Sequence, residues 1–189
     1  MARKIRVSKK DIIQAGFDIA MKEGFADVTV RNVAKKANCS IATIYFNFCD
    51  IEGLKEHILL KALLKFEQIL CEQNTESFAL DFEIASVIYA RDYSVFYDEI
   101  IIKKHSLFKS IDRIKDAALA SMKYEKLFEA ISTTDLLQLQ LKRHIFQEGL
   151  ALSAREEKYN SVFTKEYIEN LLRESIADFI ATIGVIHEN

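Results

Sequence analysis

Apolar side chains recur at spacings of three and four along nearly the whole chain, which is the periodicity of amphipathic helices. The first such segment begins at Ser8, where Ser8 and Asp11 have the spacing of a capping box, and the pattern stops at Gly24. We therefore expect a helix from about residue 8 to residue 23. Its inner side is expected to consist of Ile12, Ile13, Gly16, Phe17, Ile19 and Ala20.

Two short helices are expected within residues 29–48, TVRNVAKKANCSIATIYFNF. Thr29 has a hydroxyl that can cap the first of them, and Ser40 has one for the second. Asn38 lies between them, and asparagine tolerates the left-handed backbone of a tight helix end. The expected inner stripe of the second helix is Ile41, Ile44 and Phe48. The opposite face is expected to be small and polar, with Ser40, Ala42, Thr43, Asn47 and the tip of Tyr45.

A helix, a tight turn and a second short helix form the sequence pattern of a helix-turn-helix DNA reader. The charge distribution agrees with this interpretation. Residues 1–50 contain nine Lys or Arg and five Asp or Glu, a net charge of +4, whereas residues 51–189 contain seventeen and twenty-three, a net charge of −6. Positive charge is thus concentrated where DNA would bind. The densest cluster is Arg3, Lys4, Arg6, Lys9 and Lys10, either an arm that follows the phosphates or a solvated basic tail.

The rest of the chain also has a helical pattern. Asp50 is expected to cap a fourth helix that reaches about Cys71, and a polar break follows at 73–77. The stretch LLQLQL at 136–141 alternates like a strand, but it continues without a turn signal and is therefore expected to be helical. The chain contains no proline and only five glycines, which favours an all-α fold of about nine helices. The later helices are expected at 78–91, 94–103, 106–130, 134–154 and 165–184.

The segment IIQAGFDIAMKEGFADVTVRNVAKKANCSIATIYFNFCDIEGL resembles the N-terminal domain of the TetR/AcrR family of transcriptional regulators. Three positions depart from the family pattern. Asn38 stands where glycine is usual, Ala42 stands where glycine is common, and Ile51 stands where a lysine usually meets a phosphate. Lys55, one helical turn further on, is expected to replace part of that contact. The positions that agree are Ala15, Ile19, Gly24, Phe25, Thr29, Val33, Ala34, Ala37, Ser40, Tyr45, Phe48, Glu52 and Leu54.

The resemblance implies a helix-turn-helix DNA-binding domain of three helices at 1–50 and a larger helical domain for effector binding and dimerisation at 51–189. It implies a repressor that leaves a palindromic double-stranded DNA operator when a small-molecule effector binds, and a homodimer built from the two C-terminal helices. The motif and the resemblance together predict these DNA-binding residues: Arg6, Thr29, Arg31, Ser40, Ala42, Thr43, Tyr45, Phe46, Asn47 and Lys55.

Both C-terminal helices have wide apolar stripes, which can serve a core and a partner. The stripe in the first includes Leu137, Leu141, Ile145 and Leu152, and Gly149 interrupts it. The stripe in the second includes Tyr167, Leu171, Leu172, Ile176, Phe179, Ile180 and Ile183. The expected pocket holds a bulky, partly hydrophobic effector, although the same aromatic residues can simply fill a bundle core. Its predicted lining is Phe66, Phe82, Tyr89, Phe96, Tyr97, Phe108, Tyr124, His144 and Gln147, and further candidates are Phe128, Phe146 and His105.

Other classes of protein find little support in the sequence. No metal-spaced His or Cys cluster, phosphate-binding glycine loop or nucleophile elbow occurs, so we expect no enzyme activity, metal or cofactor. No long apolar run or secretory signal is present, so we expect a cytoplasmic protein with reduced cysteines and no membrane partner. Cys39 and Cys49 flank the recognition helix, either as a redox switch or as ordinary small residues. An alternative function is a helical protein-interaction module without specific DNA binding.

Overall fold

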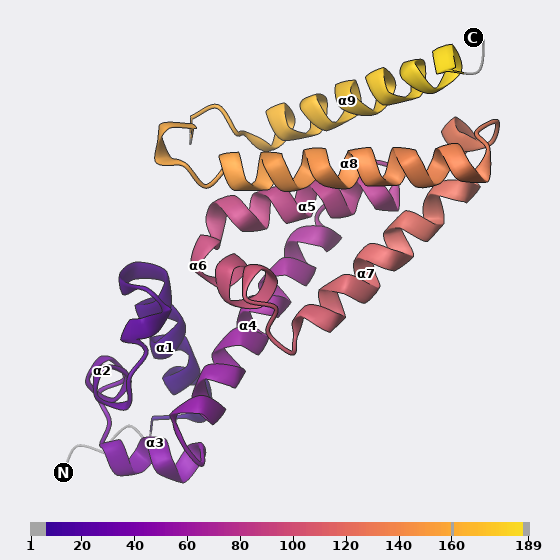
Figure 1. The fold of residues 1–189 in the computed structure, drawn as a ribbon. Coiled ribbons are helices and arrows are strands. Elements are labelled where there is room, and N and C mark those ends of the chain that lie inside the picture. The colour runs from indigo at the N-terminus through magenta and orange to yellow at the C-terminus, as the bar shows by residue number, and fades with distance from the viewer. Residues whose placement is uncertain (1–6, 160, 187–189) are drawn as a thin grey trace. The chain divides into compact units, whose positions relative to one another are not determined.

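The computed structural model describes residues 7–159 and 161–186, and this part of the chain folds into helices without strands (Figure 1). The all-α prediction is confirmed. None of the described helices is long and apolar enough to cross a membrane. The α-helices are α1 (Lys9–Glu23), α2 (Val30–Lys36), α3 (Ile41–Asn47), α4 (Ile51–Cys71), α5 (Phe78–Asp92), α6 (Ser94–Tyr97), α7 (Phe108–Ser121), α8 (Thr133–Ser153) and α9 (Lys165–Ile186).

Local hydrogen bonds set the helix starts. At α1 the Asp11 amide donates to Ser8 Oγ at 3.2 Å, and the Ser8 amide donates to Asp11 Oδ2 at 2.9 Å, which confirms the capping box. At α4 the Gly53 amide donates to Asp50 Oδ1 at 2.7 Å, as the sequence predicts. The alternating stretch at 136–141 lies inside α8, which confirms the helical interpretation.

Two predicted helices are shorter than expected. The segment predicted at 94–103 begins as α6 and continues as a π-helical turn, Asp98–Ile102. The segment predicted at 106–130 is α-helical only in α7, and two 3-10 turns follow it, Met122–Tyr124 and Lys126–Phe128. Glu125 has extended backbone between these turns, and its carboxylate accepts a hydrogen bond from the Ser77 hydroxyl at 2.9 Å. This bond across the fold holds the chain where a continuous helix is interrupted.

The chain divides into two compact units. Unit 1 contains the chain up to Lys65 together with Val95–Phe108, and unit 2 contains Phe66–Ser94 and the chain from Lys109 onward. The predicted boundary after residue 50 marks the end of the helix-turn-helix, whereas unit 1 extends through most of α4. The reason is burial, because Leu54 and Ile58 of α4 are fully buried. The chain thus passes between the units three times, once within α4.

The core of unit 1 joins α1 to α4 and to the segment Val95–Phe108, which begins within α6. A Cβ atom on Gly16 would lie 2.3 Å from Ile58 Cδ1, so glycine allows the backbone of α1 to approach α4 closely. The ring of Phe17 stacks on that of Phe96 with 4.7 Å between centroids, and Phe96 is fully buried. The predicted inner side of α1 is confirmed, with Ile13 half-buried and the other members buried.

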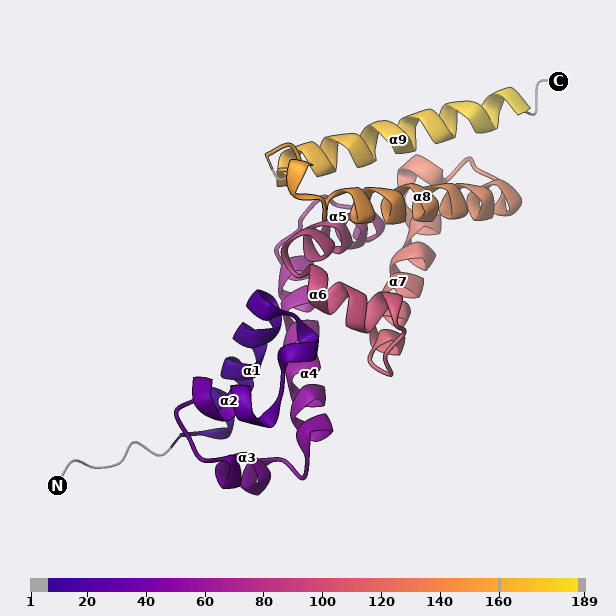
Figure 2. The ribbon, with the colours of Figure 1, turned by 60° about the vertical axis from the view of Figure 1, so that its left-hand side comes forward.

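The core of unit 2 is built on α5, which packs against both α8 and α9. Figures 1 and 2 both show α8 and α9 running alongside each other, with α5 next to α8. Eleven of the fifteen residues of α5 are buried, and one of them is a carboxylate, Glu83. Its partner is Arg143 of α8, which is also buried, at 2.8 Å. Unit 2 therefore contains an ion pair within its hydrophobic core.

Gly24 ends α1 with φ of 101° and ψ of 160°, a backbone conformation that is open essentially to glycine alone. Nothing lies within 4 Å of an added Cβ atom, so only backbone strain opposes a side chain. We expect Gly24→Ala to lower the free energy of unfolding by about 1–3 kcal/mol in urea denaturation. Gly53→Ala, in the helical backbone of α4, is the control and should leave stability unchanged or raise it by up to about 1 kcal/mol. Equal effects of both variants would contradict the strain argument.

Candidate functional site

The α2–turn–α3 segment has the geometry that the sequence predicts. Thr29 Oγ1 accepts a hydrogen bond from the Asn32 amide at 3.2 Å and caps α2. Ser40 Oγ accepts one from the Thr43 amide at 3.1 Å and caps α3. Asn38 has φ of 52°, which is the left-handed conformation expected between the two helices. These local bonds fix the turn that orients α3 against α2.

The inner face of α3 anchors the helix in unit 1. Ile44 is fully buried and Phe48 is 4% exposed, with the ring of Phe48 edge-on to His57 at 5.3 Å. The prediction that Ile41 belongs to the packed stripe is wrong, because its side chain is 44% exposed. Ile41 is the first residue of α3, and helical side chains lean toward the N-terminus. Its side chain therefore projects past the end of the helix.

The outer face of α3 is less polar than the sequence prediction. Tyr45 is 52% exposed and Phe46 is 82% exposed, and Ile41 and Ala42 are also exposed. The polar side chains of this helix already have partners. Ser40 Oγ and Thr43 Oγ1 are 2.8 Å apart, and the Asn47 amide Nδ2 donates to the Thr43 carbonyl at 2.8 Å. The surface available to a ligand is therefore mainly apolar and aromatic.

Cations lie on the neighbouring helices. Arg31, Lys35 and Lys36 are exposed on α2. Lys55 is half-buried, pairs with Glu52 at 3.0 Å, and has its Nζ 5.9 Å from the centroid of the Phe25 ring. A surface ion pair of this kind is weak, so a phosphate can compete with Glu52 for the ammonium group. Arg6, also predicted to bind DNA, lies outside the described residues.

The described cysteines and acidic residues give little support for a redox switch or a metal site. Cys39 and Cys49 are unpaired thiols on either side of α3, and burial raises the pKa of the Cys39 thiol. A raised pKa lowers the fraction of reactive thiolate, which favours the interpretation of Cys39 as an ordinary small residue. In the described part of the chain, no three His, Cys, Asp or Glu side chains are grouped so that they could hold a metal ion.

The residues predicted to line an effector pocket do not meet in one place. Phe66, Phe82 and Tyr89 are buried together in unit 2. The ring centroid of Phe66 is 5.7 Å from that of Phe82 and 5.5 Å from that of Tyr89. Tyr124 is 80% exposed. Of the other predicted lining residues, Phe96 and Tyr97 are buried in unit 1, His144 is half-buried, Gln147 is buried, and the side chain of Phe108 is outside the description.

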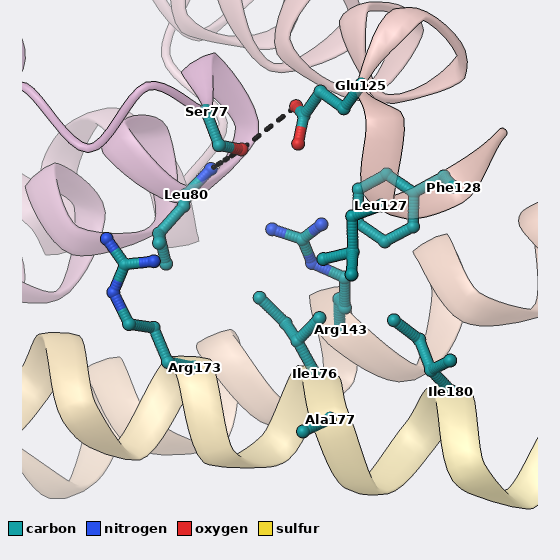
Figure 3. Close-up of a pocket in the computed structure, with 10 residues that line it drawn as sticks. All are labelled: Ser77, Leu80, Glu125, Leu127, Phe128, Arg143, Arg173, Ile176, Ala177 and Ile180. Carbon is teal, nitrogen blue, oxygen red and sulfur yellow. Dashed lines mark hydrogen bonds between the residues drawn. The ribbon is translucent and has the colours of Figure 1, made fainter.

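A cavity of about 160 Å³ lies within unit 2 (Figure 3). It opens among α5, the 3-10 turns after α7, α8 and α9. Among the predicted pocket residues whose side chains the structure describes, Phe128 alone lines it. The lining consists of Ser77, Leu80, Glu125, Leu127, Phe128, Arg143, Arg173, Ile176, Ala177 and Ile180.

Arg143 supplies the buried polar group of this cavity. Its Nε and Nη2 atoms donate to Glu83 Oε1 and Oε2 at 2.9 and 2.8 Å, and its Nη1 atom is 3.4 Å from the sulfur of Met122. A thioether is a weak acceptor, so Nη1 retains donor capacity. Figure 3 shows the guanidinium between Leu80 and Phe128. The cavity therefore combines apolar walls with a cationic donor.

Sequence reasoning missed this cation. Arg143 stands between Lys142 and His144 and looks like one more charged residue on a helix surface. The available signal was the spacing of α8, because Leu139, Arg143, Gln147 and Leu150 share its buried side. The acidic partner is sixty residues earlier, and no pattern in the sequence links the two.

The sequence similarity of this chain to known proteins lies mainly in its N-terminal region. Residues 12–58 match the bacterial regulatory proteins, tetR family. A 55-residue segment is 38% identical to the uncharacterized HTH-type transcriptional regulator YvkB of Bacillus subtilis (strain 168), and this segment covers 29% of each chain. The crystal structure of a transcriptional regulator from Rhodococcus sp. Rha1 has the same fold, with a TM-score of 0.54 over 93% of this chain and 97% of the other, at 19% identity. Residues 12–58, which contain the helix-turn-helix, therefore match the N-terminal domain of the tetR family of bacterial regulatory proteins.

Proposed function

We propose that this protein is a DNA-binding transcriptional regulator, a homodimeric repressor that a small-molecule effector releases from a palindromic operator. The observation that carries the proposal is the α2–turn–α3 segment. Its two helices are capped and packed from one side only, and the outer face of α3 is exposed next to the cations Arg31, Lys35 and Lys36. Such a segment can place α3 in the major groove while the neighbouring cations contact phosphates.

The exposed side of α8 supports the homodimer. Leu137, Leu141 and Ile145 follow at intervals of four residues and are 59–64% exposed, and Leu152 continues the stripe at 49%. One short helix reads few base pairs, whereas two helices held about 34 Å apart read both halves of a palindrome. Pairing α8 and α9 of two copies as a four-helix bundle would remove this apolar stripe from water.

The cavity in unit 2 supports effector binding. Its walls include Leu80, Phe128 and Ile176, and the Nη1 atom of Arg143 offers a donor within an apolar surrounding. An effector with an apolar body and one acceptor oxygen fits this chemistry. The predicted aromatic lining stays a prediction. The effector and the operator are proposed to favour different states of one dimer.

Two continuous segments of the chain could transmit the effect of effector binding in unit 2 to DNA binding in unit 1. α4 contributes residues to both units, and the segment Val95–Phe108 leaves unit 2 and returns to it. Within unit 1 this segment packs Phe96 against Phe17 of α1. A change in the effector unit can therefore reach the DNA-binding unit through α4 and through this segment.

The experiment that tests DNA binding uses purified protein and fragmented genomic DNA from its source, with bound fragments recovered and sequenced at 50 and 200 mM salt. We expect a recurring palindrome. If the dimer neutralises about six phosphates, its affinity should fall by about 10³-fold between the two salt concentrations. No enrichment at either concentration would favour the alternative, a protein-interaction module, since such a module has no specific affinity for duplex DNA.

Effector response has its own test. Compounds that raise the melting temperature of the protein should weaken operator binding, and the operator should weaken the binding of each such compound by the same factor. Equal affinity of a compound with and without the operator would contradict the release mechanism while leaving DNA binding intact.

A further inference from the structure

We infer that α3 selects its operator chiefly through the methyl groups of thymine, with Phe46 as the main specificity-determining residue. This inference rests on the proposed function and goes further, because it names the chemical feature of the DNA that the protein recognises.

The side chains of α3 include few groups that can form paired hydrogen bonds with a base. The sequence of the helix is IATIYFN, so it contains no Arg, Lys, Gln, Asp or Glu. Paired hydrogen bonds to guanine come from Arg or Lys, and those to adenine come from Asn or Gln. Asn47 is the single candidate, and its Nδ2 atom already donates to the Thr43 carbonyl at 2.8 Å. The described side chains of α3 therefore include few that could recognise guanine or adenine through paired hydrogen bonds.

The apolar side chains of α3 are exposed on its outer face. Phe46 is 82% exposed, the largest exposed fraction among the large hydrophobic residues of the described chain, and Tyr45 is 52% exposed. Ile41 and Ala42 complete a continuous apolar face, since residues 41, 42, 45 and 46 follow helical spacing. Exposed aromatic residues that cluster on one face indicate a binding surface.

This apolar face matches one chemical feature of the DNA major groove. The C5-methyl group of thymine is the apolar feature that a base pair presents in the major groove, and phenylalanine and alanine make contacts of this type. Phe46 is the sixth residue of α3 and adjoins Tyr45 on the same exposed surface, while Ile41 and Ala42 extend this surface to the start of the helix. An α3 with this composition is complementary to a half-site rich in thymine methyl groups.

The test replaces each thymine of the operator by uracil, one symmetric pair at a time, in a binding titration. Uracil keeps every hydrogen-bonding group of thymine and removes the methyl group. Burial of one methyl group corresponds to a factor of about four in affinity, so a contacted pair of sites should cost about 15-fold. At positions away from α3, the replacement should have no effect.

Phe46→Ala connects this effect to the residue. The variant should bind the thymine operator at least about 15-fold more weakly, and the loss caused by uracil should largely disappear, as a double-mutant cycle measures. Met21→Ala, which removes an exposed apolar side chain from α1 in the same unit, should keep both the affinity and the sensitivity to uracil. Circular dichroism should show unchanged helix content in both variants.

The outcomes separate the two proposals. If no DNA fragment is enriched, the proposed function fails. If an operator is bound but no uracil position weakens it, or if Phe46→Ala keeps full sensitivity to uracil, the reading through thymine methyl groups is overturned while DNA binding stands. Loss of sensitivity to uracil in Phe46→Ala alone supports the inference.

Discussion

Replacing Arg143 by methionine is expected to lower the free energy of unfolding by about 3–5 kcal/mol, a large part of the 5–15 kcal/mol that stabilises a typical domain. The Arg143 side chain is buried, and two of its nitrogens donate to the Glu83 carboxylate. Without this partner a buried carboxylate has no compensating charge. Urea denaturation at fixed protein concentration measures the loss, because the stability of a dimer depends on concentration.

A second variant distinguishes the uncompensated charge from lost packing. In Arg143→Met combined with Glu83→Leu, both charges are replaced by apolar groups, and most of the lost stability should return. Arg173→Met is the matched control, since Arg173 also lines the cavity but is exposed and pairs with Glu169 on the surface of α9. It should change stability by less than about 1 kcal/mol. A double variant as unstable as Arg143→Met would show that packing, not charge, is responsible.

The decrease in the free energy of unfolding caused by Arg143→Met should depend on pH. Burial raises the pKa of Glu83, and the Arg143 guanidinium opposes this effect, so removing the guanidinium raises the pKa further. A carboxyl whose pKa is higher in the folded state than in the unfolded state stabilises the fold while it stays protonated, and that stabilisation is lost as the pH rises. The deficit of Arg143→Met relative to the wild type should therefore be smaller at pH 5 than at pH 8. A deficit that is constant with pH would contradict this explanation.

Features that depend on residues close together in the sequence are predicted correctly, whereas those that depend on distant residues are not. Ser8, Thr29, Ser40 and Asp50 were identified as caps because each one bonds an amide three residues later, which the sequence displays directly. The exposure of Ile41 was not predicted, because helical spacing gives the direction of a side chain and not what covers it. The same spacing describes a buried and an uncovered position equally well.

The cavity depended on contacts that the sequence does not display. Glu83 and Arg143 are sixty residues apart in the sequence, and the hydrogen bond between Ser77 and Glu125 joins residues forty-eight apart. Aromatic content suggests a pocket, yet Phe82 and Tyr89 both pack edge-on against Phe66 in the core of unit 2. A bundle without tryptophan needs such rings to fill its interior, so their number alone does not distinguish a core from a ligand site.

Ile145→Glu is expected to convert the proposed dimer to monomers and to weaken operator binding by about 100-fold or more. Ile145 is 64% exposed within the apolar stripe of α8, and symmetry would place two of the new carboxylates in one interface without a partner. Sedimentation measures the oligomeric state, and titration with the operator measures affinity. Leu64→Glu is the control, because Leu64 is 63% exposed on α4, outside the stripe, and this variant should stay dimeric. If Ile145→Glu remains a dimer, the stripe of α8 is not the interface, and if its monomer binds the operator with full affinity, recognition does not require two linked α3 helices.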